Sequence, residues 1–160
     1  MRLKVTTCLW FDGNAQEAAK FYVSIFKNSK ITSVSHFPEG TPRPKGSVMT
    51  VEFELDGHHI MALNGGPNYK LSPAVSLCVD CDTQAEIDQL WDKLVADGEE
   101  SGCGWLIDKF GLSWQLVPKE LLAWMTDKAP EKAKRVTLAL MQMKKIDIKK
   151  LQDARDGLAA

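Results

Sequence analysis

The chain has 160 residues, 44% of them hydrophobic and 26% charged, and its formal net charge at pH 7 is -1. This length suits one domain with a substantial core. The nearly balanced charge argues against a general nucleic-acid or anionic-membrane binder, because both need a basic surface. The chain has no run of about 18 apolar residues, and its opening, Met1–Lys4, lacks the apolar segment of a signal peptide. We therefore predict a single cytoplasmic domain over residues 1–160.

The four cysteines are expected to be free thiols, because a domain of this size needs no disulfides and export is not indicated. Cys78 and Cys81 have the Cys-x-x-Cys spacing, which supports redox chemistry where it opens a helix. Here the first of them lies inside the apolar run 75–79, and a zinc site would need a second pair. The favoured interpretation is two thiols at the end of a strand.

The first half of the chain has the pattern of a strand, a helix and three strands. Asn14 is predicted to cap the helix, with Glu17 completing a capping box. Apolar residues with helical spacing follow, at positions 15, 18, 19, 22, 25 and 26. The dipeptide Asp56-Gly57 is a strong hairpin signal. The predicted strands are residues 5–11, 31–37, 48–55 and 58–63.

The second half repeats this order. A strand is predicted over 74–79, a helix begins at Asp82 or Thr83 with Glu86 closing a capping box, and strands follow within 99–106 and 112–117. A shift of about 68 residues lays one half on the other, so that Phe11 meets Val79. The pattern predicts an α+β fold of two tandem βαβββ modules, over residues 5–68 and 72–118.

The remaining residues, 119–160, form a predicted helical tail. Leu121, Leu122 and Met125 make one short apolar stripe, and Pro130 suits the first turn of a longer helix. A last short helix is predicted to be capped by Asp147, while Met141 and Met143 are interpreted as core filler. The tail is expected to pack on the domain or on a partner subunit.

Several phrases resemble one known family: Phe11–Ala15 followed by Phe21-Tyr22, Leu63–Pro67, Cys103–Trp105 and Asp108–Gln115. With the doubled module, they resemble the PhnB-like branch of the vicinal-oxygen-chelate superfamily, which includes glyoxalase, bleomycin-resistance proteins and extradiol dioxygenases. This branch is often labelled demethylubiquinone methyltransferase-like. The resemblance implies curved mixed sheets that form half-barrel clefts, a homodimer and, in the classical enzymes, a metal bound by His, Gln or Glu.

The resemblance also implies where such a metal would be held. The ligand positions fall near Thr7 and Ala74 in the first strands, at Gln115 in the last strand, and near Ile60 or Met61 in the first half. Of these residues only Gln115 is a reasonable ligand, whereas a divalent ion needs three or four. We therefore predict no classical metal site, although the resemblance keeps a divalent metal as an alternative.

The candidate ligand-binding residues are Gln115, Trp105, Trp114, Asn64 and Cys8. Indole faces supply apolar area and the Gln115 amide supplies both a donor and an acceptor. Trp114 and Gln115 are neighbours on a strand, so only one of them faces the cleft, and the superfamily register selects Gln115. The alternative interpretation makes the tryptophans core residues and Asn64-Gly65-Gly66 a plain connector.

Cys103, between two glycines, is the candidate for catalysis, because the open backbone there allows a ligand to approach closely. A nucleophilic thiol needs a neighbouring cation or base, however, and the sequence shows none. His58 and His59 are adjacent and face opposite sides of a strand, so they do not easily share a metal.

Three hypotheses of function follow. The first is a small-molecule-binding protein or enzyme of the PhnB-like type, without the classical metal site. The second is a non-catalytic protein that sequesters a small aromatic or apolar compound, as bleomycin-resistance relatives do. The third is a metal-dependent isomerase, lyase or dioxygenase. The methyltransferase label is not supported, because a methyl donor usually binds a parallel doubly wound sheet with a Gly-rich turn.

Overall fold

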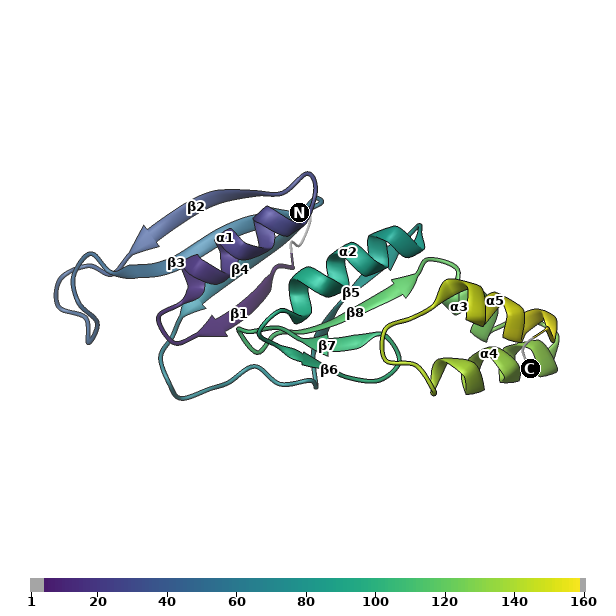
Figure 1. Ribbon diagram of the computed structural model, residues 1–160. Helices are drawn as coiled ribbons and strands as arrows, with labels where there is room; N and C mark the ends of the chain where they lie inside the picture. The colour runs from purple at the N-terminus through teal and green to yellow at the C-terminus, as the bar shows by residue number, and fades with distance from the viewer. Residues whose placement is uncertain (1–4, 159–160) are drawn as a thin grey trace. The chain divides into compact units, whose positions relative to one another are not determined.

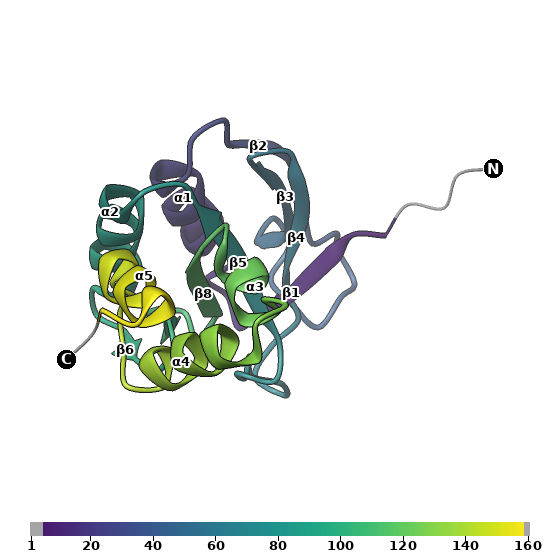
Figure 2. The same cartoon turned by 90° about the vertical axis from the view of Figure 1, so that its right-hand side faces the viewer.

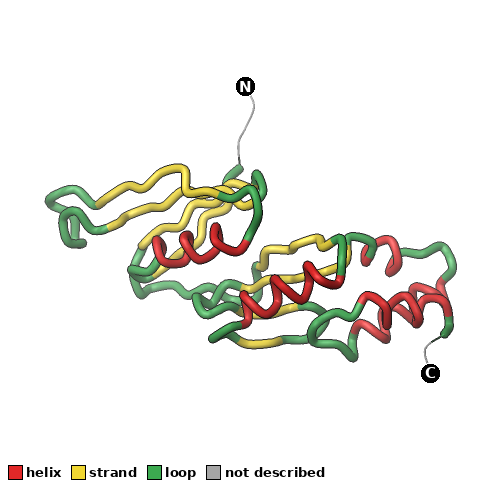
Figure 3. The backbone as a smooth tube through the Cα atoms, turned by 45° about the horizontal axis from the view of Figure 1, so that its top comes forward, coloured by secondary structure: helices red, strands yellow, loops and turns green. Residues whose placement is uncertain are grey.

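The computed structural model describes residues 5–158 and divides into two compact units, with the boundary in the chain between Leu71 and Ser72. Each unit contains a four-stranded mixed sheet with one helix across a face, and the second unit carries three further helices (Figures 1 and 3). This confirms the predicted α+β class and the tandem βαβββ order. The single-domain organisation stays a prediction. None of the helices in residues 5–158 has the length and apolar character needed to cross a membrane.

The first unit is built around the sheet order β1-β4-β3-β2. Strands β1 and β4 run parallel, and the other pairs are antiparallel. Tyr22 of the helix is fully buried and stacks on Phe53 of the sheet, with ring centroids 6.1 Å apart. The elements are β1 (Thr7–Phe11), α1 (Ala15–Ile25), β2 (Lys30–His36), β3 (Val48–Leu55) and β4 (His58–Asn64).

The second unit repeats this topology with the order β5-β8-β7-β6. The predicted strand over 99–106 is two short strands, because the chain turns between them at Cys103, whose φ is 59°. The N–H of Cys103 donates to Met143 O in the tail at 2.7 Å, which removes this turn from the sheet. The elements are β5 (Ser76–Cys81), α2 (Gln84–Val95), β6 (Glu99–Glu100), β7 (Trp105–Ile107) and β8 (Ser113–Pro118).

The two helix N-termini are closed in different ways. For α2, the predicted capping box is confirmed, since Glu86 N donates to Thr83 Oγ1 at 3.2 Å and the Glu86 side chain returns to the Thr83 N–H. For α1, the predicted box is wrong, because the Asn14 side chain makes no capping bond. Asn64, at the end of β4, replaces it: its Oδ1 accepts from Gly13 N and Ala15 N, both at 3.0 Å.

The strand register refines the predicted repeat. Phe11 pairs with Asn64 in the first sheet, and Cys81 pairs with Pro118 in the second. The last residues of β1 and β5 are therefore 70 apart, since 81 − 11 = 70. The predicted shift of about 68 residues, which set Phe11 on Val79, is therefore two residues shorter than the shift between these strand ends.

The tail consists of α3 (Leu121–Met125), α4 (Pro130–Leu140) and α5 (Ile148–Asp156), and α4 and α5 lie side by side (Figure 2). The predicted proline at the start of α4 and the Asp147 cap of α5 are confirmed. The predicted apolar stripe of α3 and the role of Met141 as core filler are wrong, because Leu122 is 74% exposed and Met141 is 64% exposed.

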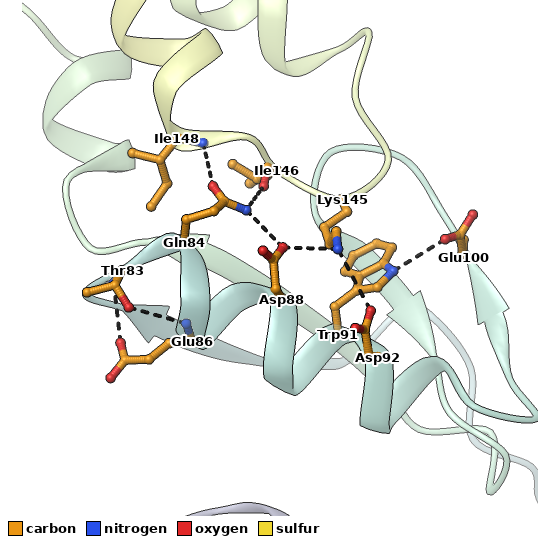
Figure 4. Close-up of polar contacts among 10 residues, drawn as sticks. All are labelled: Thr83, Gln84, Glu86, Asp88, Trp91, Asp92, Glu100, Lys145, Ile146 and Ile148. Atoms are coloured by element: carbon orange, nitrogen blue, oxygen red, sulfur yellow. Dashed lines mark hydrogen bonds and ion pairs between the residues drawn. The ribbon is translucent and has the colours of Figure 1, made fainter.

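The tail packs on α2 through an apolar cluster and a polar network. Ile146 and Leu151 of the tail are buried with Ile87 of α2 and Cys81 of β5. Figure 4 shows Gln84 at the centre of the network: its Nε2 donates to Ile146 O at 2.9 Å, and its Oε1 accepts from Ile148 N at 2.8 Å. The helical tail is thus an integral part of the second unit.

Candidate functional site

The second sheet has one face covered by α2 and an opposite face that carries two of the predicted ligand-binding residues, Gln115 and Trp105. Val79 and Cys81 belong to the apolar cluster that contains Ile87 of α2, and we assign them to the helix-covered side of β5. Because side chains alternate along a strand, the residues between them point to the other side. We call this side the Gln115 face, and its central residues are Ser76, Cys78, Trp105, Ser113 and Gln115.

The centre of the Gln115 face is a hydrogen-bonded pair. Gln115 Nε2 donates to Ser76 Oγ at 2.9 Å, across the parallel pairing of β8 with β5. Trp105 is the pairing partner of Gln115 on β7 and is half-buried, as Gln115 itself is. The structure therefore brings together two of the five predicted ligand-binding residues, Gln115 and Trp105.

Ser113 lies on the same face, two residues before Gln115, and pairs with Ser76. Its side chain is 1% exposed, and its Oγ has no hydrogen-bond partner in residues 5–158. Neither serine was singled out from the sequence. Once Gln115 is assigned to this face, two-residue alternation also assigns Ser113 to it, but Ser76 depends on the strand pairing.

Trp114 lies on the helix-covered side of β8 and is 1% exposed. Its Nε1 donates to Asp108 Oδ2 at 2.8 Å, while Asp108 Oδ1 accepts from Phe110 N at 2.9 Å and Leu112 N at 3.0 Å. Asp108 therefore closes the turn between β7 and β8 and anchors the indole. The structure gives Trp114 a place in the core, as the alternative interpretation held.

Asn64 is also committed to the fold. Besides accepting the two N–H groups at the start of α1, its Nδ2 donates to Val48 O at 3.0 Å, and the residue is 6% exposed. Gly65 and Gly66 follow it, and Trp10 Nε1 donates to Gly66 O at 2.8 Å. This segment therefore acts as a connector held by hydrogen bonds.

The helix-free face of the first sheet differs in charge from the Gln115 face. Cys8 is exposed there beside its pairing partner Met61. Further along, His59 Nε2 lies 3.0 Å from Glu54 Oε1, and Lys30 Nζ lies 3.7 Å from Glu54 Oε2. The structure places Cys8 on this charged face, in a different unit from Gln115.

The Cys103 thiol, the candidate for catalysis, packs against the apolar cluster under the tail and is half-buried. The other two thiols of this unit belong to β5. Burial, with a contribution from Asp80, raises the pKa of the Cys78 thiol. Burial, followed by the carboxylates of Glu86, Asp80 and Asp82, raises the pKa of Cys81 to about 12. Neither of these two thiols is activated for nucleophilic attack.

The residues of the two sheets do not fit the metal that the superfamily resemblance implies. Residues 5–158 contain no group of three His, Cys, Asp or Glu side chains able to hold a metal ion. Ala74 precedes β5 and lies in a turn, and Thr7 pairs with the buried Ile60. Gln115 Oε1 is therefore a single candidate ligand at these positions, where a divalent ion needs three or four. We therefore assign no chemical step to a metal.

Comparison with known proteins adds family information. A sequence model named 3-demethylubiquinone-9 3-methyltransferase matches residues 3–117. A Bacillus cereus structure described as a putative 3-demethylubiquinone-9 3-methyltransferase, PhnB protein, is 40% identical with a TM-score of 0.66, and covers 72% of this chain and 99% of its own. No match was found among curated proteins.

Two more distant structures share the fold. Protein PA1353 from Pseudomonas aeruginosa is 22% identical with a TM-score of 0.61, over 73% of this chain and 98% of its own. The other is a mutant of the fosfomycin resistance protein FosX from Listeria monocytogenes, complexed with Mn(II) and a dihydroxypropylphosphonic acid. It is 12% identical with a TM-score of 0.50, and the match covers 72% of this chain and 92% of the FosX chain. The tail helices lie beyond the residues that the sequence model matches.

Proposed function

Because this chain belongs to the PhnB-like family of the vicinal-oxygen-chelate superfamily, we propose that it binds a small molecule on the Gln115 face, without a classical metal site. The methyltransferase description is the name of the family and not an activity assigned to this chain. Members of the superfamily bind small molecules, which makes a sheet face opposite the helix the first place to look for a ligand.

The observation that carries the proposal is the Gln115–Ser76 hydrogen bond in the middle of this face. The bond orients the amide and leaves Gln115 Oε1 and one amide hydrogen without a partner in residues 5–158. Trp105 supplies indole surface beside them. A few oriented polar groups next to aromatic area are typical of small-molecule sites.

The chemistry of this face favours binding over catalysis. It holds no histidine, and its one thiol, Cys78, has a raised pKa because of burial and Asp80. A general acid or base with a pKa near the working pH is therefore lacking among its central residues. Sequestration of a compound without turnover is the form of the proposal that this face supports best.

A thermal-shift screen of small neutral and charged compounds tests the proposal on the full chain. Compounds that raise the melting temperature are compared for the wild type, Gln115→Ala and the matched control Gln89→Ala, which removes an exposed amide from α2. Ligand shifts that shrink only in Gln115→Ala support the site. Equal shifts in all three proteins would remove Gln115 from it.

Three further points are part of the proposal. We propose that the chain is a cytoplasmic homodimer and that it purifies without a stoichiometric metal. Light scattering measures the mass in solution, and a monomer mass would refute the dimer. Elemental analysis measures metal content, and one equivalent of iron, zinc, nickel or manganese would favour the third hypothesis, a metal-dependent isomerase, lyase or dioxygenase.

A further inference from the structure

We infer that the Gln115 face selects an uncharged ligand with a planar apolar body and a carbonyl, amide or hydroxyl group, and that Ser113 is a specificity-determining residue. The inference rests on the proposed function, since it assumes that this face binds a ligand. It adds the class of the ligand and a residue that the sequence did not indicate.

The first step is the state of the Ser113 hydroxyl. The side chain is 1% exposed, and Oγ has no hydrogen-bond partner in the described part of the chain. A buried hydroxyl that makes no hydrogen bond destabilises the folded protein, because it has lost its bonds to water. Alanine would fill the same position without this cost. A ligand on the Gln115 face whose polar group reached this hydroxyl would supply the missing partner.

The second step is the set of polar groups around it. Ser113 pairs with Ser76, and the Ser76 Oγ accepts from Gln115 Nε2 at 2.9 Å. Two hydroxyls and one amide thus lie on neighbouring strands and one face, and together they offer both donors and acceptors. An uncharged group that both accepts and donates, such as an amide, is complementary to such a set.

The third step is the distribution of charge. The buried or half-buried side chains at the centre of this face are Ser76, Trp105, Ser113 and Gln115, and none of them is ionisable at neutral pH. The charged residues of this face, Asp80 and Glu99, are exposed and belong to the edge strands β5 and β6. An ionised ligand group brought beside Ser113 would lose water without gaining a counter-ion. Its binding is therefore disfavoured.

The fourth step is the apolar surroundings. Trp105 pairs with Gln115, and Ile107 pairs with Ser113, and both are half-buried on β7. Indole surface packs well against planar rings, with ring centroids about 4.5–7 Å apart. The polar side chains of Ser76, Ser113 and Gln115 thus lie beside an apolar surface that suits an aromatic or other flat ligand.

Three compounds of the same shape test the charge preference: benzamide, benzoate and benzamidinium. Each is titrated into isotope-labelled full-length protein, and the backbone amide signals and the Gln115 side-chain amide are followed by NMR. We expect benzamide to shift the signals of Ser76, Ser113 and Gln115, and the two ions to bind at least about fivefold more weakly. Loss of one hydrogen bond in Ser113→Ala should weaken benzamide about fivefold.

Ser72→Ala is the matched control, because Ser72 is exposed and precedes β5. Unchanged benzamide affinity in Ser113→Ala would overturn the role of Ser113. Tighter binding of benzoate or benzamidinium at the same signals would overturn the uncharged class while leaving the proposed site intact. If none of the three probes shifts these signals and the thermal screen finds no ligand that depends on Gln115, the proposed function itself fails.

Discussion

The side-chain oxygen of Asn64 accepts a hydrogen bond from the backbone N–H of Ala15 at 3.0 Å, so the end of strand β4 closes the first turn of helix α1. The two residues are 49 positions apart in the chain. A second N–H, that of Gly13, reaches the same oxygen, and the Asn64 amide nitrogen donates to Val48 O. One buried amide thus joins the helix to two strands.

Replacement of Asn64 by alanine should destabilise the protein by about 2 kcal/mol, because two helix N-terminal N–H groups and one strand carbonyl lose their partner. Urea unfolding of the full chain measures this change. Asn68→Ala is the control, since Asn68 is exposed, and Asn14→Ala should also be nearly neutral, since its side chain makes no capping bond. Destabilisation by Asn14→Ala of the same size would contradict the assignment.

The caps show what the sequence can predict about this fold and what it cannot. The Thr83 box was found because both partners lie within four residues, whereas the Asn64 cap depends on a contact between distant segments. Strand β3 was predicted at its observed bounds because alternation marks a strand with one buried face. The turn at Cys103 was missed because tail backbone, not local sequence, holds it.

In the candidate site too, features set by neighbouring residues were predicted, and features set by contacts between distant segments were not. Gln115 was predicted because alternation lets only one of Trp114 and Gln115 face the cleft, and the register of the resembled superfamily selects Gln115. The sequence did not show that Trp114 is held in the core by Asp108, six residues earlier, or that Ser76 pairs with Ser113. Pairing between strands β5 and β8 decides the composition of the face, and a single sequence carries little information about it.

Replacement of Ser113 by alanine should stabilise the ligand-free protein by about 1 kcal/mol, because it removes a buried hydroxyl that makes no hydrogen bond. The urea midpoint of the variant measures the change. Ser76→Ala is the contrasting variant: it removes the acceptor of the Gln115 amide and should lower the midpoint. A lower midpoint for Ser113→Ala would show that its hydroxyl already has a partner in the free protein.

Replacement of Gln84 by alanine should loosen the tail, because this amide holds both Ile146 O and Ile148 N (Figure 4). Loss of these bonds should cost about 2 kcal/mol. Hydrogen exchange measures the effect, and faster exchange is expected around Ile148–Leu151 but not in the first unit. Gln89→Ala on the same helix is the control. Unchanged exchange in Gln84→Ala would mean that the apolar cluster alone holds the tail.

Low pH should weaken the contact between the tail and α2 by protonating Asp88. Hydrogen bonds from Lys145 and then Gln84 hold the pKa of this carboxyl below its ordinary value of 3.8. Because the folded-state pKa is the lower one, the stabilising contribution is complete above about pH 4 and is lost as the pH falls through that lower value. The ion pair of Asp88 with Lys145 is partly exposed. Its contribution to the free energy of unfolding is therefore less than about 1 kcal/mol and decreases with salt.

The measurement for Asp88 is the urea midpoint at pH 6 and pH 3 in low salt. Asp88→Asn should reduce the difference between the two pH values, since the amide does not titrate. Asp97→Asn is the control, because Asp97 is exposed and makes no ion pair with residues 5–158. An equal reduction in both variants would assign the acid sensitivity to other carboxylates.

The thiols should differ in reactivity in an order set by burial. Cys8 is exposed on the first sheet, whereas Cys81 is 2% exposed and has a pKa raised to about 12 by burial and nearby carboxylates. Iodoacetamide at pH 8 should therefore modify Cys8 in the folded protein and Cys81 only after unfolding, because the thiolate is the reactive form. Mass spectrometry of peptides measures both rates.

Strand geometry and a raised thiol pKa argue against a redox role for the Cys-x-x-Cys sequence. Cys78 and Cys81 lie three positions apart on one strand, so their side chains point to opposite faces of β5. Burial and Asp80 also raise the pKa of Cys78, which slows attack on any disulfide. Oxidised glutathione should leave the pair unbridged in the folded chain. A Cys78–Cys81 disulfide found by mass spectrometry under native conditions would require β5 to leave the sheet, and would overturn the strand assignment there.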